Sequence, residues 1–118
     1  MMVTRTALLQ GTCRHLTEGA SEAQVRDALS VLNDWAQIDG LLQREFRFAD
    51  YHQTIAFVNA VAAMTHQEDH HPDMLISYNR CTVRYSTHSA GGISHNDFIC
   101  AAKVDDIYLK GPWQSAKA

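Results

Sequence analysis

The sequence has 118 residues, of which 46% are hydrophobic and 19% are charged, and its formal net charge is −3 with histidines neutral. This is the composition of one small globular domain, and it excludes the fibrous and disordered classes. The weak negative charge, without a block of Lys or Arg, argues against a nucleic-acid partner. The longest mostly apolar run, residues 55–64, is about half as long as a membrane span needs to be, so no membrane association is expected.

The cysteines indicate a cytoplasmic protein. There are three of them, Cys13, Cys81 and Cys100, and they form no Cys-x-x-Cys pair. An odd number of unclustered cysteines, together with an N-terminus that lacks a secretory signal, favours reduced thiols. We expect residues 1–20 to be a loose N-terminal arm, residues 21–110 a single domain and residues 111–118 a C-terminal tail.

The first regular elements are a helix and a hairpin. Ser21 and Gln24 form a capping-box pattern, and apolar residues with helical spacing follow, which predicts a helix over residues 22–33. Two strand-like runs, residues 35–38 and 41–48, flank Asp39-Gly40. Asp-Gly between such runs is typical of a tight hairpin, because both residues tolerate positive φ.

The second helix is apolar on two sides. Asp50 is a good N-cap, and Pro72 ends the segment. One stripe contains Tyr51, Ile55, Val58 and Ala62, and the other contains Phe57, Val61 and Met64. A single sheet cannot cover both stripes in so small a monomer, so we expect a homodimer or homotetramer.

A second hairpin follows, because one strand over residues 73–87 would be too long for this domain. A turn at Asn79-Arg80 places the apolar residues on one face by pairing Tyr78 with Cys81, Ile76 with Val83 and Met74 with Tyr85. Tyr78 is then expected to pack in the core. Two residues farther on, the same register places His71 opposite His88.

The last element is a helix that begins after Ser94 and runs to about residue 109. Ser94 and Asp97 form a second capping box, and Ile93 and Phe98 occupy the positions of a hydrophobic staple. The element order is therefore αββαββα. The predicted fold class is α+β, a four-stranded antiparallel sheet with helices packed on one face.

The histidines and their surroundings resemble a known signature. The pattern His66-x3-His70-His71-Pro72-x5-Tyr78-x9-His88-x8-Asp97, with Thr87-His88 and Gly92-Ile93-Ser94, is similar to that of pterin-4a-carbinolamine dehydratases. The resemblance covers about residues 21–109. It departs at Met74, where the family often has an aromatic residue, and at His66, where it often has an acid.

The resemblance implies a hydro-lyase that dehydrates 4a-hydroxytetrahydropterin to quinonoid dihydropterin, the recycling step for the pterin cofactor of aromatic amino-acid hydroxylases. Imidazole can donate a proton to the leaving hydroxyl and accept the N5 proton near neutral pH, so no metal or cofactor is required. The candidate catalytic residues are His70, His71 and His88. We expect His70 and His88 to do the acid/base work and His71 to position the hydroxyl-bearing face. The candidate substrate-binding residues are His66, Pro72, Thr87, Ser89 and Asp97.

Several of these residues also have a purely structural interpretation. Adjacent histidines favour the C-terminal end of a helix dipole, and a capping role alone would explain Asp97. His66 is on the same helical face as His70 and is a candidate for the pocket wall.

Three other functions remain open. The histidines could hold zinc, although Gln67 stands where the His-Glu-x-x-His motif needs its Glu. The chain could instead act on the pterin of molybdopterin metabolism. It could also be a helix-binding regulatory or dimerisation module that uses the second apolar stripe.

Overall fold

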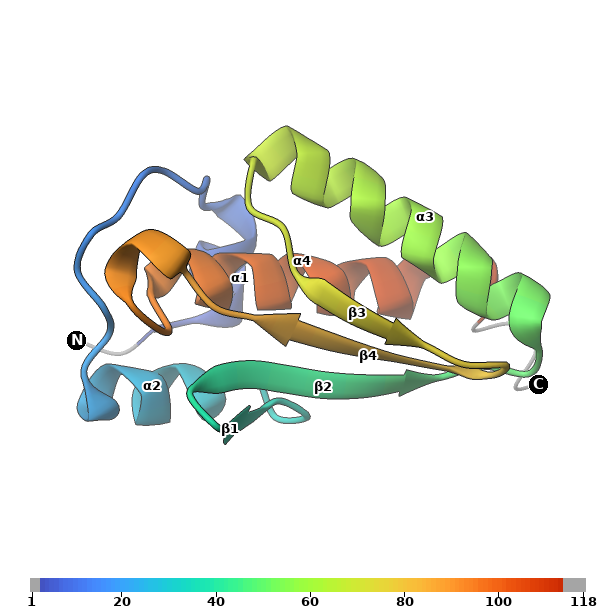
Figure 1. The fold of residues 1–118 in the computed structure, drawn as a ribbon, viewed down its shortest axis with the longest axis horizontal. Helices are drawn as coiled ribbons and strands as arrows, with labels where there is room; N and C mark the ends of the chain where they lie inside the picture. Colours follow the sequence, from blue (N-terminus) through green and yellow to red (C-terminus); the bar gives the residue numbers. More distant parts are fainter. Residues whose placement is uncertain (1–2, 114–118) are drawn as a thin grey trace.

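The computed structural model describes residues 3–113 and has one antiparallel sheet with helices on one face, as the sequence predicts (Figure 1). The strand order is β1-β2-β4-β3. The strands are β1 (Ala36–Ile38), β2 (Leu41–Arg47), β3 (Asp73–Ile76) and β4 (Arg80–Tyr85). The helices are α1 (Arg5–Gln10), α2 (Glu22–Leu29), α3 (Tyr51–Glu68) and α4 (His95–Lys110), with a short 3₁₀ helix η1 (His88–Ala90).

The local signals in the sequence form the elements they predict. Ser21 caps α2 in a complete capping box with Gln24, although α2 ends at Leu29 rather than near residue 33. Asp39 and Gly40 both have positive φ, 52° and 76°, and connect β1 to β2 in the expected hairpin. The Asp50 side chain accepts a hydrogen bond from the Gln53 N–H and caps α3.

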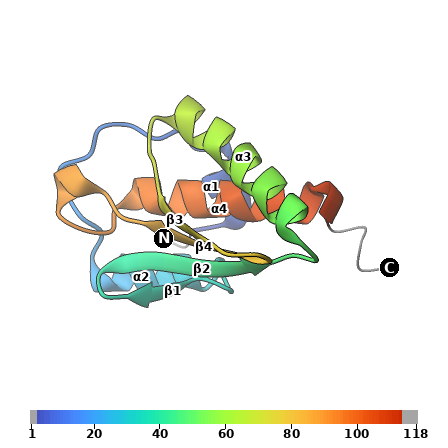
Figure 2. The same cartoon turned by 45° about the vertical axis from the view of Figure 1, so that its right-hand side comes forward.

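The core lies between one face of the sheet and helices α3 and α4 (Figure 2). Strand residues alternate, and the residues buried on the face toward these helices are Leu42 and Phe46 of β2 and Cys81, Val83 and Tyr85 of β4. Phe46 from β2 and Phe57 from α3 lie at the centre of an aromatic cluster, with ring centroids 4.8 Å apart. Each is 1% exposed or less, and substituting either would leave a large cavity.

The apolar faces of α3 divide between core and surface. Phe57 and Val61 are fully buried, whereas Tyr51 on the other stripe is 51% exposed. None of the helices that the structure describes is long and apolar enough to cross a membrane.

The second hairpin differs from the predicted register by two residues. The observed pairs are Asp73 with Arg84, Met74 with Val83, Leu75 with Thr82 and Ile76 with Cys81. The turn is Tyr78-Asn79 rather than Asn79-Arg80, and Tyr78 is 64% exposed, so the expectation that it packs in the core is wrong. A shift of two residues keeps each side chain on the predicted face, which is why the apolar pattern did not reveal it.

Contacts from outside the hairpin hold this turn in place. The Thr54 hydroxyl of α3 donates to the Tyr78 carbonyl over 3.0 Å. The Phe48 N–H donates to the Asn79 carbonyl over 2.9 Å. Both backbone acceptors of the turn are therefore satisfied by tertiary contacts, which a pairing argument within the hairpin cannot include.

The N-terminal region is more ordered than the expected loose arm. Thr4 caps α1, which packs against α4, and Leu8 is 1% exposed. The Arg5 guanidinium lies 3.5 Å from the buried Asp105 carboxylate of α4. Six helical residues are too few turns to show a periodicity, so α1 could not be predicted from the apolar pattern.

The start of the C-terminal tail is also part of the fold. Trp113 is 6% exposed and its indole N–H donates to the Tyr108 carbonyl over 2.8 Å. The remainder of the predicted tail, residues 114–118, lies outside the described residues.

Candidate active site

His70 is placed by the end of α3. Asp69 caps that helix in the left-handed conformation, with φ 53° and ψ 40°, and turns the chain back toward the sheet. The His70 N–H still donates to the Thr65 carbonyl, over 3.2 Å. Its ring stacks on Tyr85 of β4, with centroids 5.3 Å apart and planes inclined by 24°. The backbone hydrogen bond and the stacking on Tyr85 together fix the position of the imidazole.

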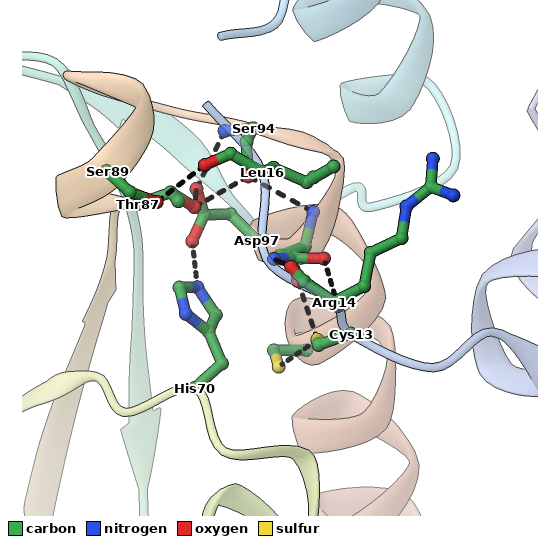
Figure 3. A network of polar contacts seen from close by, with 10 residues as sticks. Cys13, Arg14, Leu16, His70, Thr87, Ser89, Ser94 and Asp97 are labelled. Carbon is green, nitrogen blue, oxygen red and sulfur yellow. Dashed lines mark hydrogen bonds and ion pairs between the residues drawn. The ribbon is translucent and has the colours of Figure 1, made fainter. Parts of the chain in front are cut away.

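The carboxylate of Asp97 holds the His70 ring from the other side. His70 Nε2 lies 2.6 Å from Asp97 Oδ1, and the Asp97 side chain is fully buried (Figure 3). The other oxygen, Oδ2, accepts hydrogen bonds from the Ser94 N–H over 2.8 Å and from the Thr87 hydroxyl over 2.9 Å. One carboxylate thus caps α4 and also binds the histidine.

This pairing sets the protonation of His70. Burial alone would lower the pKa of its imidazole, but the hydrogen bond and the charge of Asp97 outweigh burial and raise that pKa above the ordinary value. The ring can therefore carry a proton near neutral pH. Because Nε2 faces Asp97, Nδ1 is the ring nitrogen left for another partner.

His88 and His70 line the same cavity. His88 is exposed and begins η1, directly after Thr87. The cavity has a volume of about 400 Å³, within the usual range for small-molecule sites. Its walls come from residues 13–16, the end of α3 with His70, the segment 87–89 and Asn96. A neighbouring hollow of about 560 Å³ also contains His88 but not His70.

A cavity lined by a carboxylate-bound imidazole and two further histidines, His15 and His88, is suited to proton transfer on a small ring system. The family model for pterin 4 alpha carbinolamine dehydratase matches residues 18–107. The chain belongs to the pterin-4a-carbinolamine dehydratase family. This confirms the family expected from the histidine signature.

Similar proteins from several bacteria carry the same provisional name, pterin-4-alpha-carbinolamine dehydratase. The chain is 50% identical over 101 residues to one from Nitrosomonas eutropha, covering 82% of this chain and 89% of the relative. It is 48% identical over 105 residues to one from Chromobacterium violaceum, covering 87% and 97%.

Solved structures show the same fold. A transcriptional coactivator/pterin dehydratase from Brucella melitensis is 31% identical, with a TM-score of 0.74, and covers 77% of this chain and 99% of that one. A pterin dehydratase-like protein described as a RuBisCO assembly factor of the alpha-carboxysome is 25% identical, with a TM-score of 0.56, and covers 66% and 93%.

The structure changes which histidines of the dehydratase signature are neighbours. The predicted register brought His71 and His88 together, but the observed register places Ser86 opposite position 71 when carried past Asp73. His71 is exposed and does not line the cavity with His88. His70, which the sequence tied to the site only by resemblance, is the ring that lines this cavity and binds Asp97.

The candidate substrate-binding residues are placed in different ways. Thr87 is 4% exposed, and its hydroxyl lies 2.9 Å from Asp97 and 2.6 Å from the Ser94 hydroxyl. The Ser89 hydroxyl donates to the Leu16 carbonyl over 2.5 Å. His66 is exposed on α3 and Pro72 is half-buried, and neither lines the cavity with His70.

Sequence reasoning missed the segment 13–16 and Asn96, which also line the cavity. The hydrogen bonds that hold the segment use its backbone groups. Because every residue has these groups, the sequence does not show which of them are used. Within residues 3–113, no three His, Cys, Asp or Glu side chains are grouped so that they could hold a metal ion.

Proposed function

We propose that this protein dehydrates 4a-hydroxytetrahydropterin to quinonoid dihydropterin by histidine acid/base catalysis. The observation that supports this most directly is the pairing of His70 with the buried Asp97 carboxylate in a cavity that His88 shares. The reaction removes the hydroxyl from C4a and the proton from N5. It therefore needs one proton donor and one acceptor on the same small molecule.

His70 is the proposed proton donor. Its raised pKa favours the protonated ring, and Nδ1 is the nitrogen not held by Asp97. A proton from Nδ1 converts the 4a-hydroxyl into water as the C4a–O bond breaks. Asp97 stabilises the imidazolium before transfer through its contact with Nε2, so it orients His70 and does not touch the pterin.

His88 is the proposed acceptor. Its exposed ring lies on the cavity wall, and a neutral imidazole there can take the N5 proton as the electron pair forms the C4a=N5 double bond. Exchange with water then returns both histidines to their starting states. We keep His71, the residue after His70, as a group that positions the hydroxyl-bearing face, and His66, Pro72, Thr87 and Ser89 as residues that shape the site.

The decay of 4a-hydroxytetrahydropterin, followed with and without the protein, tests this proposal. The wild type should accelerate the decay, and His70→Ala and His88→Ala should each lower the catalysed rate by about 100-fold or more. His52→Ala, at an exposed position in the first turn of α3, is the matched control and should keep full activity. A wild type that matches the spontaneous rate, or active His70→Ala and His88→Ala variants, would contradict the assignment.

A role in pterin recycling follows from this chemistry. The partners would be the pterin substrate and, through its cofactor cycle, an aromatic amino-acid hydroxylase in the cytoplasm. A related reaction on the pterin of molybdopterin metabolism is the alternative within enzymes. Comparing decay rates for the two classes of pterin distinguishes them.

A non-enzymatic role is the second candidate function. The relative described as a RuBisCO assembly factor shows that the fold can be associated with assembly. Here the exposed stripe of α3 around Tyr51 is a surface for a homodimer, a homotetramer or a partner helix. Light scattering distinguishes a homo-oligomer from a monomer, and an active protein would leave the assembly role without support.

A further inference from the structure

The segment of residues 13–16 crosses the candidate active site from outside the family domain. It belongs to the stretch between α1 and α2, and the family model begins after it, at residue 18. In both ribbon views this blue stretch passes the end of the molecule where η1 and the first turn of α4 lie (Figures 1 and 2). Its four residues all line the cavity of His70 and His88.

Hydrogen bonds tie this segment to three different elements. The Cys13 N–H donates to Glu68 Oε1 at the end of α3, over 2.8 Å. Arg14 exchanges two hydrogen bonds with the Asn96 side chain in α4, through its N–H over 3.2 Å and its carbonyl over 2.5 Å. The Leu16 carbonyl accepts from the Ser89 hydroxyl of η1 over 2.5 Å (Figure 3).

Each anchor lies within two residues of His70, His88 or Asp97 in the sequence. Glu68 precedes His70 by two residues, and Ser89 follows His88 directly. Asn96, which is 5% exposed, directly precedes Asp97. The end of α3, η1 and α4, which carry or directly precede these three residues, are thus connected through one backbone segment.

The charge of Glu68 strengthens the first anchor. Burial alone would raise the pKa of its carboxyl, but the Cys13 N–H and the Lys103 ammonium, 3.1 Å away, outweigh burial and lower that pKa. Glu68 therefore stays ionised and accepts a charge-assisted hydrogen bond from the segment.

We propose that residues 13–16 are a strap that positions His70, His88 and Asp97 relative to one another and closes one wall of the pterin cavity. The proposal rests on the proposed function. The strap acts through its anchors and does not take part in proton transfer. Errors of about 1 Å in the relative placement of catalytic groups lower rates by up to about 100-fold, so a loosened strap should mainly lower kcat.

Arg14→Pro tests this, with Thr17→Ala as the control. Arg14→Pro removes the N–H that binds Asn96, whereas Thr17→Ala changes an exposed side chain directly after the strap that does not line the cavity. We expect kcat to fall about 10-fold or more in Arg14→Pro and to stay within about 2-fold of wild type in Thr17→Ala. Assays run well below both melting temperatures separate this effect from unfolding.

The NMR signals of the His70 ring give a readout that does not depend on activity. They should shift in Arg14→Pro and match wild type in Thr17→Ala. If Arg14→Pro does not fold, Asn96→Ala, which leaves the strap sequence intact, decides by the same measurements. An unchanged kcat and an unchanged His70 signal in a folded Arg14→Pro or Asn96→Ala protein would overturn the proposal. An inactive wild type would refute the proposed function, and the His70 signals would then decide whether the strap positions this residue.

A separate observation concerns the thiols that join the strap to α4. Cys13 Sγ and Cys100 Sγ are 3.4 Å apart, although 87 positions separate them in the sequence. A disulfide needs a sulfur–sulfur distance of about 2.05 Å, so a shift of roughly 1.4 Å would join them. Their contact lowers the pKa of the Cys100 thiol and, together with burial, raises the pKa of the Cys13 thiol, so Cys100 is the sulfur that more readily forms the thiolate. Cys13 also lines the cavity, which gives a small oxidant access.

We infer that hydrogen peroxide can convert this contact into a disulfide that fastens the strap. Peroxide oxidises one thiolate to a sulfenic acid and releases hydroxide. The second sulfur then attacks the first, the S–S bond forms and a second hydroxide leaves. The two thiol protons convert both hydroxides to water, so two thiols and one peroxide give one disulfide and two waters.

Thiol counting and mass measurement after peroxide treatment test the disulfide. Two of the three thiols should be lost, the monomer mass should fall by 2 Da, and the melting temperature should rise by roughly 10 °C. Cys81→Ala should behave like wild type in losing two thiols, whereas Cys13→Ser and Cys100→Ser should form no intramolecular bond. Oxidation that gives only cross-linked dimers or sulfonic acids, or a disulfide that persists in Cys13→Ser, would overturn this inference.

Discussion

Replacing Asp97 by Asn separates the two tasks of this carboxylate. The amide oxygen of Asn can take the place of Oδ2 and accept from the Ser94 N–H and the Thr87 hydroxyl, so the cap of α4 is kept. The amide nitrogen then faces His70 in place of Oδ1, where it can bind a neutral ring but repels an imidazolium. Without the charge of Asp97 to oppose it, burial should lower the pKa of His70.

The size of the effect follows from the lost interaction. A hydrogen bond to a charged group contributes about 1.5–3 kcal/mol, and the 2.6 Å contact joins a fully buried carboxylate to a ring that is 13% exposed. If the imidazolium is the proton donor, this loss corresponds to a rate roughly 10- to 150-fold lower. Asp106→Asn, the same substitution at a carboxylate that pairs with Lys110 on the outside of α4, is the control and should leave the rate unchanged.

The pH dependence of the rate and of the stability tests the direction of this pKa change. A donor loses activity as the pH rises through its pKa, so the falling limb of the rate profile should move to lower pH in Asp97→Asn. Because the pKa of His70 in the folded protein is raised above its ordinary value of 6.5, the stability it contributes is complete below 6.5 and is lost as pH rises through the folded-state pKa. The difference in free energy of unfolding between wild type and Asp97→Asn should therefore narrow as the pH rises.

Pre-steady-state decay of 4a-hydroxytetrahydropterin across this pH range, with urea unfolding at the same pH values, measures both effects. A falling limb that does not move, or a stability difference that widens with pH, would refute the view that Asp97 acts by keeping His70 protonated.

Three further predictions concern other parts of the molecule. Thr87→Val removes a buried hydroxyl that binds Asp97 and should lower the free energy of unfolding by about 1–3 kcal/mol in urea titrations, whereas Thr87→Ser should retain most of it. Burial raises the pKa of the Cys81 thiol to about 11, so a thiol reagent should modify it much more slowly in the folded protein than in urea; equal rates would contradict its burial. Tyr51→Glu puts a charge on the exposed stripe of α3 and should shift the protein toward monomer in light scattering, and an unchanged mass would remove this stripe as the self-association surface.

The fold was predictable because its local signals agree with its apolar pattern. Ser21, Asp50 and Ser94 each begin a helix where the sequence places them, and Asp39-Gly40 makes the expected turn. Strand positions buried in the core alternate as the pattern requires. These features depend on neighbouring residues and on which face is apolar, and both can be inferred from sequence.

The misplaced turn and the hidden strap have a common cause. The Tyr78-Asn79 turn is held by Thr54 and by the Phe48 N–H, and the strap is held through its backbone by side chains from three elements. Such contacts join a backbone group to a residue that is distant in sequence, and neither partner belongs to a repeating pattern. The error of two residues in the hairpin therefore led to the wrong neighbour for His88, although the predicted faces of the residues in β3 and β4 were correct.

Asp97 shows why a structural explanation and a functional one need not compete for the same residue. The capping box explains why the sequence needs an acceptor at this position, but it uses only Oδ2, which accepts from the Ser94 N–H and also from the Thr87 hydroxyl. The cap also fixes the orientation of the carboxyl group, and this directs Oδ1 at His70. A helix cap thus supplies, at no further conformational cost, a preorganised anion for an imidazolium, because the carboxylate is already desolvated and immobile when the helix forms. A Gln at this N3 position could complete the same capping box, as Gln24 does in α2, but it would leave the histidine without a charged partner.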